Sequence, residues 1–468
     1  MSGIKPRRFD LIVIGAGAAG LSAVYGAASL GLKVALIERG AMGGDCLNTG
    51  CVPSKSLLSI AHKARQSGQI PPWETIKAGF TRAIAEIAPN DSIARYTSLG
   101  ATVITGEARF TGPDQIMVNG EYLTARRFVV ATGSSPRIPA IMGVADLPFL
   151  TSDTIWQMGR LPDHLLILGG GPIGLEMADA FSGLGVAVTV IEARMMGARE
   201  DADLFAPVRA ALEAAGVRLM DQTEIELARP WREGVELLTK AGQIIQGSHL
   251  LVAIGRAADF AALDLPRAGV LTSQAGIVTD QGLRSISNKR VYAAGDIADP
   301  KGIGPRHFTH VAGYHGGIVI RRALFRLPAK IDYAALPRVT YTAPELAQVG
   351  MTAAEAVAAG RFGRSLVWPF AENDRAIAEA ETAGLVKLVL DPRGRLIGAG
   401  IVGPGAGEMI GLYGLAISAK LKLAAIAALI LPYPTRSEAG KRAIGAFYAE
   451  KLFAPWPRRL VRLLARLP

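Results

Sequence analysis

The feature that most constrains the fold is a strand, a glycine loop, a helix and a second strand that follow one another closely near the start of the chain. An apolar segment at residues 10–14 predicts a buried strand, and the Ala-rich segment that ends near residue 30 predicts a helix. A second apolar segment at residues 33–37 ends in Glu38. The loop between the first strand and the helix contains Gly15, Gly17, Ala18, Ala19 and Gly20.

The same unit recurs in the middle of the chain. Residues 164–168 and 187–191 are apolar and flank a helical segment, and the second strand again ends in an acidic residue, Glu192. In both copies the acid lies 23 positions after the first glycine. The loop of this copy contains Gly169, Gly171, Pro172, Ile173 and Gly174. Such an internal duplication predicts two nucleotide-binding domains.

A loop of this type suits the phosphates of a dinucleotide. Its first glycine permits a tight turn, the second lets the backbone approach a pyrophosphate, and the third lets helix and strand pack closely. The helix N-terminus offers N–H groups and a partial positive charge to the phosphates. Because a carboxylate repels a 2′-phosphate, Glu192 favours NADH, whereas Arg194 and Arg199 nearby leave NADPH binding open.

The last third of the chain has a different pattern of apolar residues and turns. Segments 384–390 and 396–402 predict two strands around a turn, Ala-rich helices follow, and there is no nucleotide loop. We therefore expect an α/β protein with two Rossmann-like, three-layer nucleotide-binding domains and a C-terminal α+β domain.

Charge and hydropathy narrow the class of protein further. The formal charge is +11, but the basic residues are scattered without a run of five, so we expect no nucleic-acid partner. The start of the chain does not resemble a secretory signal, and no apolar run reaches the ~18–20 residues that span a bilayer. We therefore expect a cytoplasmic protein, in a compartment that keeps thiols reduced.

The two cysteines, Cys46 and Cys51, are separated by four residues. Pro53 follows where a helix would begin, and Lys55 adds a positive charge one turn later. A cysteine at a helix N-terminus has a pKa below the free value of about 8.5, and a pair of this kind can cycle between dithiol and disulfide. Two inert buried cysteines are one alternative. A zinc half-site is another, but no further Cys and no clustered His supplies its remaining ligands, so we expect no resident metal.

Residues 43–55 read GGDCLNTGCVPSK and resemble the redox motif of the class I pyridine nucleotide–disulfide oxidoreductases, which include dihydrolipoamide dehydrogenase, glutathione reductase and mercuric reductase. The resemblance extends over nearly the whole chain. It implies an FAD-dependent NAD(P)H oxidoreductase that forms a homodimer with a shared active site. The domains it implies are an FAD-binding domain at 1–150 and 273–337, an NAD(P)-binding domain at 151–272, and a dimerisation or interface domain at 338–468.

The resemblance also implies roles for individual residues. Cys51 would be the thiolate beside the flavin, Cys46 would attack the acceptor, and Lys55 would pair with Glu176 near the flavin. The implied cofactor contacts are Gly15, Gly17, Ala18, Ala19, Gly20, Glu38, Arg39, Gly44, Asp45, Lys55, Ala108, Ala131, Thr132, Gly133, Gly169, Gly171, Pro172, Ile173, Gly174, Glu192, Gly255, Arg256, Gly295, Asp296, Thr309 and His310.

One position departs from the family pattern. Family disulfide reductases carry His-Pro-Thr-x-x-Glu near the C-terminus, whereas residues 433–438 of this chain read YPTRSE. The resemblance implies that Tyr433 and Glu438 complete the active site of the partner subunit. Histidine titrates near neutrality, but tyrosine, with a reference pKa of about 10, is a poor base there. Tyr433 therefore either packs through its ring and hydroxyl or contacts the acceptor.

Three functions fit these features. The first is an NADH-driven reductase that passes electrons through the flavin and the cysteine pair to an unidentified disulfide or thiol acceptor. The second is a reductase of a metal ion or a quinone. Mercuric reductases also place a tyrosine at this position, but they use a C-terminal cysteine pair to hand over the metal, and this chain has no third cysteine. The third is a flavin-binding redox sensor without catalysis.

The end of the chain, residues 457–468, places four leucines at helical spacing opposite arginines: Leu460, Leu463, Leu464 and Leu467. We expect this segment to pack on its own domain. Peripheral contact with an anionic membrane surface is the alternative.

Overall fold

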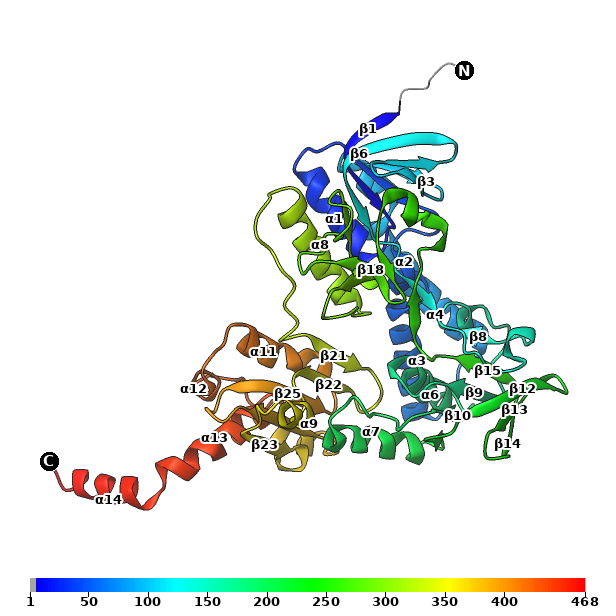
Figure 1. Ribbon diagram of the computed structural model, residues 1–468. Helices are drawn as coiled ribbons and strands as arrows, with labels where there is room; N and C mark the ends of the chain where they lie inside the picture. Colours follow the sequence, from blue (N-terminus) through cyan, green and yellow to red (C-terminus); the bar gives the residue numbers. More distant parts are fainter. Residues whose placement is uncertain (1–5, 468) are drawn as a thin grey trace, which may run out of the picture. The chain divides into compact units, whose positions relative to one another are not determined.

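The computed structural model describes residues 6–467, which divide into two compact units (Figure 1). The first unit consists of the residues up to 163 together with 226–237 and 245–331. The second consists of 164–225, 238–244 and the residues from 332 onward. This division is coarser than the expected boundaries at residues 150, 272 and 337, which stay a prediction.

The core of the first unit is a seven-stranded sheet in the order β3-β2-β1-β6-β5-β4, with β19 paired to β6. Strands β1, β2, β3, β6 and β19 are parallel, and β4 and β5 continue the sheet in antiparallel fashion. Their bounds are β1 (Arg7–Ile14), β2 (Val34–Glu38), β3 (Thr102–Thr105), β4 (Arg109–Gly112), β5 (Gln115–Val118), β6 (Glu121–Val130) and β19 (Val291–Ala293). The strands predicted at 10–14 and 33–37 are confirmed.

Helix α1 (Ala18–Ser29) lies against this sheet, and helix α8 (Thr309–Ala323) lies beside α1 (Figure 1). Small residues allow their close approach, because a Cβ added to Gly316 would lie 2.5 Å from Ser22 Cβ. The other helices of the unit are α2 (Gly44–Asn48), α3 (Cys51–Ser67), α4 (Trp73–Ile87) and α5 (Ile93–Ser98). Helix α3 packs against α4, where a Cβ on Gly79 would lie 2.8 Å from Ile60 Cδ1.

The remaining short strands pair with one another. The antiparallel pair is β7 (Ser134–Pro136) with β16 (Arg256–Ala258), and the parallel pair is β8 (Leu150–Thr151) with β15 (His249–Val252). Two three-stranded sheets consist of β17 (Thr272–Ser273), β18 (Gly276–Thr279) and β20 (Ala298–Pro300), and of β12 (Ile225–Trp231), β13 (Gly234–Thr239) and β14 (Ile244–Gly247).

The second unit contains the repeated strand–helix–strand motif. Strands β9, β10 and β11 pair in parallel, and the predicted strands at 164–168 and 187–191 are confirmed. The elements are β9 (His164–Leu168), α6 (Pro172–Gly183), β10 (Ala187–Ile191), α7 (Ala202–Ala214) and β11 (Arg218–Met220).

The same unit holds a five-stranded antiparallel sheet in the order β21-β22-β25-β24-β23. Its strands are β21 (Pro337–Thr340), β22 (Leu346–Gly350), β23 (Arg364–Pro369), β24 (Leu385–Leu390) and β25 (Leu396–Val402). The associated helices are α9 (Ala353–Ala358), α10 (Asp374–Ala378), α11 (Ala406–Ser418), α12 (Leu423–Ala427) and α13 (Glu438–Leu452). Fully buried Phe370, Leu388 and Ile401 belong to its core, so the expected α+β domain is confirmed.

The last helix is α14 (Pro455–Leu464), and none of its residues is buried. Within residues 6–467, no helix combines the length and the apolar character needed to cross a membrane. Pro468, the last residue of the predicted tail, lies outside the described residues.

Candidate active site

The first glycine loop has the conformation that only glycine permits. Gly15 has φ +103°, and a Cβ there would lie 2.3 Å from the carbonyl oxygen of Ala131. A Cβ on Gly20 would lie 1.9 Å from the carbonyl oxygen of Gly15. A Cβ on Gly17 would make only an ordinary contact, 3.9 Å from the Cα of Gly44, and Gly17 precedes α1 without a side chain that caps it. The N–H groups at the start of α1 are therefore open to an anion such as a phosphate.

The second loop repeats this geometry. Gly169 has φ +111°, and a Cβ on Gly174 would lie 1.9 Å from the Gly169 carbonyl oxygen. A Cβ on Gly171 would face open space, and Pro172 occupies the first position of α6. A proline costs nothing there, because the first N–H of a helix has no intrahelical partner. The two glycine loops predicted from sequence therefore have the same backbone geometry. Each is called a glycine cradle below.

A carboxylate accepts hydrogen bonds from backbone N–H groups beside each glycine loop. Glu38 accepts hydrogen bonds from the N–H groups of Ala16 at 2.6 Å and Gly40 at 2.7 Å. Glu192 accepts equivalent bonds from the N–H groups of Gly170 at 2.8 Å and Arg194 at 3.0 Å. Each acid therefore lies beside its glycine loop, in the position expected for a group that binds ribose hydroxyls.

The end of β6 brings several predicted residues to the first loop. The Ala131 N–H donates to the carbonyl of Ile14 at 2.8 Å, and the Thr132 hydroxyl donates to the carbonyl of Asp259 at 2.8 Å. The Asp259 carboxylate in turn binds Arg39 at 2.5 Å. Gly133 follows Thr132 at φ +75°. The predicted residue Ala108 is buried and directly precedes β4.

The cysteine pair connects α2 and α3. Cys46 lies in α2, and Cys51 is the first residue of α3. Gly50 makes the tight turn between them, because a Cβ there would lie 2.9 Å from the Asp45 carbonyl oxygen. The Cys51 sulfur lies 3.5 Å from Thr309 Oγ1. Hydrogen bonding to Cys51, together with burial, raises the pKa of Cys46, so Cys46 departs from the low pKa expected of such a pair.

Arg256 joins the cysteine segment to Asp296 through a hydrogen-bond network. Its guanidinium forms an ion pair with Asp45, the residue before Cys46, and a second one with Asp153 at 3.2 Å. Its Nε donates to Ser134 Oγ at 2.8 Å, and this hydroxyl donates to Asp296 at 2.7 Å. Three predicted positions, Asp45, Arg256 and Asp296, thus share one hydrogen-bond network. The preceding Gly255 makes the turn into it at φ +114°.

The turn at Gly295 is held by a histidine on α8. The Gly295 N–H donates to Nδ1 of His315 at 3.1 Å, which requires the neutral imidazole with Nδ1 unprotonated. Burial lowers the pKa of His315 to about 4, in agreement with this role as acceptor. Thr309 and His310 begin the same helix, and the ring of His310 stacks on Phe308 with 5.1 Å between ring centroids.

Glu176 lies in α6 of the second unit. It is 5% exposed, and its carboxylate accepts a hydrogen bond from the Tyr341 N–H at 3.1 Å. The cation expected to pair with it, Lys55, lies on α3 of the first unit. This pairing therefore stays a prediction.

Tyr433 lies on a well-anchored loop of the second unit. Its side chain is 70% exposed, and a hydrogen bond to Asp374 raises its pKa. Buried Asn373 donates to the carbonyl of Thr435 at 3.1 Å, and Arg436 forms an ion pair with Glu379 at 2.6 Å. The contacts of Thr435 and Arg436 therefore fix the loop, while the Tyr433 side chain is exposed to solvent. The other predicted residue of this segment, Glu438, is the first residue of α13.

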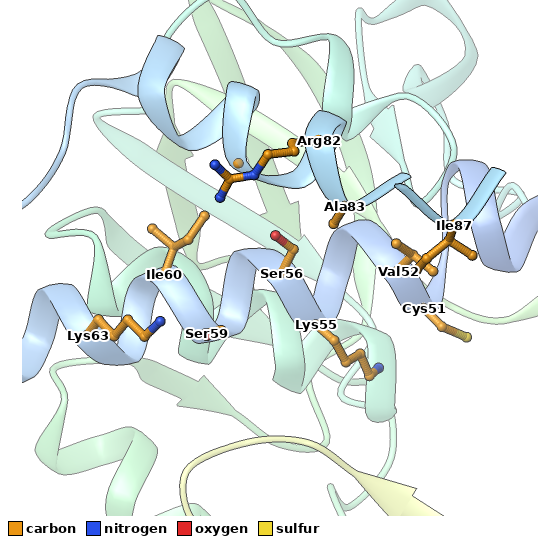
Figure 2. Close-up of a pocket in the computed structure, with 11 residues that line it drawn as sticks. Cys51, Val52, Lys55, Ser56, Ser59, Ile60, Lys63, Arg82, Ala83 and Ile87 are labelled. Atoms are coloured by element: carbon orange, nitrogen blue, oxygen red, sulfur yellow. The ribbon is translucent and has the colours of Figure 1, made fainter. Parts of the chain in front are cut away.

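A groove of about 510 Å³ runs between α3 and α4, and Cys51 lies at one end of it (Figure 2). Cys51, Lys55 and Lys63 line it from α3, and Figure 2 shows Arg82 reaching over it from α4. Three of the side chains that line the groove are therefore cations.

Comparison with protein families identifies both parts of the chain. Residues 9–318 match the pyridine nucleotide-disulphide oxidoreductase family. Residues 336–444 match the dimerisation domain of the pyridine nucleotide-disulphide oxidoreductases. This chain belongs to the pyridine nucleotide-disulphide oxidoreductases. It is accordingly an NAD(P)H-dependent flavoprotein oxidoreductase, and its dimerisation domain supports a homodimer.

Several members of this family are similar over almost their full length. The mercuric reductase of Streptomyces lividans is 35% identical, with 94% of this chain and 97% of that protein covered. The dihydrolipoyl dehydrogenase of Thermus scotoductus is 33% identical, with 95% and 99% covered. Among solved structures, the Cu(II) complex of the HOCl-induced flavoprotein disulfide reductase RclA from Escherichia coli is 26% identical at a TM-score of 0.85, with 92% and 99% covered.

The glycine cradles fit the cofactors of the family, FAD and NAD(P)H. The observation that supports this fit is the lack of close contacts at two glycines where a Cβ would obstruct a phosphate: Gly171 faces open space, and a Cβ on Gly17 would lie 3.9 Å from the Cα of Gly44. Glu38 and Arg39 would bind FAD at the first glycine loop. Glu192 would bind the nicotinamide nucleotide at the second.

Sequence reasoning missed three residues that hold the site together: Ser134, Asp259 and His315. Ser134 and Asp259 act through contacts with residues more than one hundred positions away in sequence. His315 contacts Gly295, which lies 20 residues before it. The one sequence signal for it was the position of His315 directly before the small and apolar residues of segment 316–320.

Proposed function

We propose that this chain reduces a thiol-binding metal ion such as Cu(II), whose reduced form Cu(I) is soft, with NADH as the electron donor and with Cys46 and Cys51 as the groups that bind and reduce the ion. The observation that carries the proposal is Tyr433, which occupies the position of the family histidine. The hydrogen bond to Asp374 raises the pKa of Tyr433, so its hydroxyl stays protonated at neutral pH. It therefore cannot serve as the base that a disulfide reductase needs.

Reduction of a disulfide requires proton transfers, and this site lacks a base for them. The reaction begins with attack by a thiolate and ends with protonation of the thiolate that leaves. Cys51 and burial raise the pKa of Cys46, so the attacking sulfur is held as a thiol. With Tyr433 unable to take that proton, attack by Cys46 on a disulfide would be slow.

A soft metal ion avoids this obstacle. Thiolates are the preferred ligands of soft ions, and metal binding itself displaces the thiol proton. Two Cu(II) ions would each take one electron from the two thiolates, which then form the Cys46–Cys51 disulfide, and the two protons go to solvent. The chemistry that FAD supplies when bound is the return of an electron pair from NAD(P)H to this disulfide.

The relatives and the site support the same choice. The similar proteins include mercuric reductases and a disulfide reductase whose structure was solved as a Cu(II) complex. Glu192 supports NADH as the donor, because its carboxylate lies at the second glycine loop, where it would repel a 2′-phosphate. The proposal includes the expectation from sequence that the protein resides in the reducing cytoplasm.

Steady-state oxidation of NADH by the holoenzyme with Cu(II), supplied as a weak amino-acid chelate, tests the proposal. We expect Cu(II)-dependent turnover with about two Cu(I) formed per NADH, measured with a Cu(I)-specific chelator. Cys46→Ser should lose this turnover, and Ser67→Ala on the same stretch of chain should keep it. Equal Cu(II) reduction in Cys46→Ser and the wild type would contradict the proposal.

A small anionic disulfide is the second candidate, favoured by the groove between α3 and α4. Its volume of about 510 Å³ exceeds what an ion needs, and Lys63 and Arg82 would attract carboxylates. If this candidate is right, oxidised glutathione should give a higher kcat/KM than Cu(II), and Lys63→Glu with Arg82→Glu should reduce it. If Cu(II) is the acceptor at the cysteines, the same double variant should leave Cu(II) reduction within about twofold of wild type.

A further inference from the structure

The final helix of the chain presents an apolar face with no cover. Helix α14 follows α13 (Figure 1), and none of its residues is buried. Trp456 is 71% exposed, and Leu463 and Leu464 are 61% and 52% exposed. Just before it, Leu452 and Phe453 are also exposed, which extends the apolar surface back to the end of α13. Isolated exposed leucines are ordinary, but a continuous apolar helix face marks an interaction site.

Apolar and basic residues occupy separate faces of this helix. At 3.6 residues per turn, one face carries the large apolar side chains, Trp456, Leu460, Leu463, Leu464 and Leu467. The opposite face carries Arg458, Arg459, Arg462 and Arg466. Residues 451–467 contain no Asp or Glu. Within the described chain, these arginines form no ion pair with an acidic side chain.

We infer that α14 binds the surface of an anionic lipid membrane and attaches this enzyme peripherally to it. The apolar face would enter the boundary between headgroups and acyl chains, and the arginines would remain at the level of the lipid phosphates. Trp456 suits this boundary, because its ring is apolar while its N–H can remain hydrated. Arginine stems can cover apolar surface while their guanidinium groups reach the phosphates.

Charge decides between the two occupants that could cover the apolar face. If α14 paired with α14 of a second copy through the apolar faces, the arginines on the opposite faces of both helices would stay without a negative partner. An anionic membrane neutralises all four arginines and Lys451 at once, and each basic residue near such a surface adds to binding. A helix of 10 residues is too short to span a bilayer but long enough to lie on one.

Co-sedimentation of the full-length holoenzyme with lipid vesicles tests the inference. We expect binding to phosphatidylcholine vesicles that contain about one quarter phosphatidylglycerol, and much weaker binding to phosphatidylcholine alone. Salt at about 0.5 M should reduce the binding, because it screens the arginines. The double variants Leu463→Gln with Leu464→Gln, and Arg459→Gln with Arg462→Gln, should each weaken binding by about tenfold or more.

Matched variants elsewhere on the second unit provide the controls. Arg361→Gln with Arg393→Gln removes the same charge from exposed positions, and Val357→Gln removes an exposed apolar side chain. These should keep wild-type vesicle binding. A blue shift of fluorescence on adding anionic vesicles should be present in the wild type and reduced in Trp456→Phe.

Two results would overturn the inference. The first is equal sedimentation of the wild type with anionic and neutral vesicles, or unchanged binding by the α14 double variants. The second is a change in oligomeric mass on replacing Leu463 and Leu464, measured by light scattering, without binding of the wild type to vesicles. That outcome would assign the apolar face to a second copy of the chain.

Discussion

At the scale of single residues, the exchange of histidine for Tyr433 has a measurable consequence. The raised pKa of Tyr433 removes any titration of this residue from the range around neutrality. We predict that Tyr433→His introduces an inflection at about pH 6.5 in kcat/KM for a disulfide such as lipoamide. The same variant should raise disulfide turnover by about tenfold or more, since a positioned base contributes at least that much.

Steady-state rates between pH 5.5 and 8.5, which bracket the reference pKa of about 6.5, measure this effect. Tyr433→Phe is the control, because it removes the hydroxyl without adding a base. An identical pH profile in Tyr433→His and Tyr433→Phe would mean that position 433 does not reach the reacting sulfur.

His315 leads to a second prediction, on stability. Its pKa is about 4 in the folded protein and about 6.5 when unfolded, so the unfolded chain binds the extra proton between these values. Stability from His315 is therefore present above about pH 6.5 and is lost as the pH falls toward 4. From pH 7 to pH 5 this loss is about 2 kcal/mol.

His315→Gln keeps an acceptor for the Gly295 N–H but does not titrate. We expect the fall in unfolding free energy between pH 7 and pH 5, measured by urea unfolding, to be about 2 kcal/mol smaller in this variant. His249, whose pKa burial also lowers, is present in both proteins and cancels. Parallel pH dependence of the two proteins would show that His315 is charged in the native state.

At the scale of elements, a buried lysine joins β24 to the start of α7. Lys387 is 8% exposed, and its ammonium lies 2.8 Å from Asp201 and 2.7 Å from Asp203. Burial lowers the pKa of Lys387, but the two carboxylates outweigh burial and the net pKa is raised. The stabilisation is therefore present below the unfolded pKa of about 10.4 and lost as the pH rises through the folded value.

We predict that Lys387→Met lowers the unfolding free energy by about 3 kcal/mol at pH 7, because it leaves the buried carboxylate of Asp201 without its charge partner. Urea unfolding at pH 7 measures the change. Lys422→Met, at an exposed position of the same unit, should change stability by less than about 0.5 kcal/mol. Equal stability of the two variants would contradict a role for this ion pair.

Local sequence patterns predicted the helices and strands of the fold well. They did not predict contacts between residues far apart in the sequence. The strands before both glycine loops, and Glu38 and Glu192 after them, follow from periodicity and spacing within about thirty residues. The bond between Arg256 and Asp45 joins positions 211 residues apart, and no local pattern predicts it. The outward face of α14 was visible in sequence, but whether it was covered depended on the packing of the whole unit.

At the scale of the whole molecule, the resemblance predicts an active site shared between two subunits, and this stays a prediction. Cys46 lies in the first unit and Tyr433 in the second, on a loop whose tyrosine is 70% exposed. An exposed tyrosine on a loop held firmly by Asn373 and Arg436 is the arrangement expected of a residue that serves a partner. In a two-fold dimer, each active site would then combine Cys46 of one subunit with Tyr433 of the other.

A mixed dimer tests this arrangement. One subunit carries Cys46→Ser and the other Tyr433→Arg, in which a cation would repel a metal ion from the cysteines. If the site is shared, one of the two sites in the mixed dimer combines both changes and the other is wild type. We therefore predict about half of wild-type Cu(II) reduction, although both parental homodimers are strongly impaired. Co-expression with two affinity tags isolates the mixed dimer. If each site instead lies within one subunit, every site of the mixed dimer carries a change, and its rate should not exceed the average of the two parents.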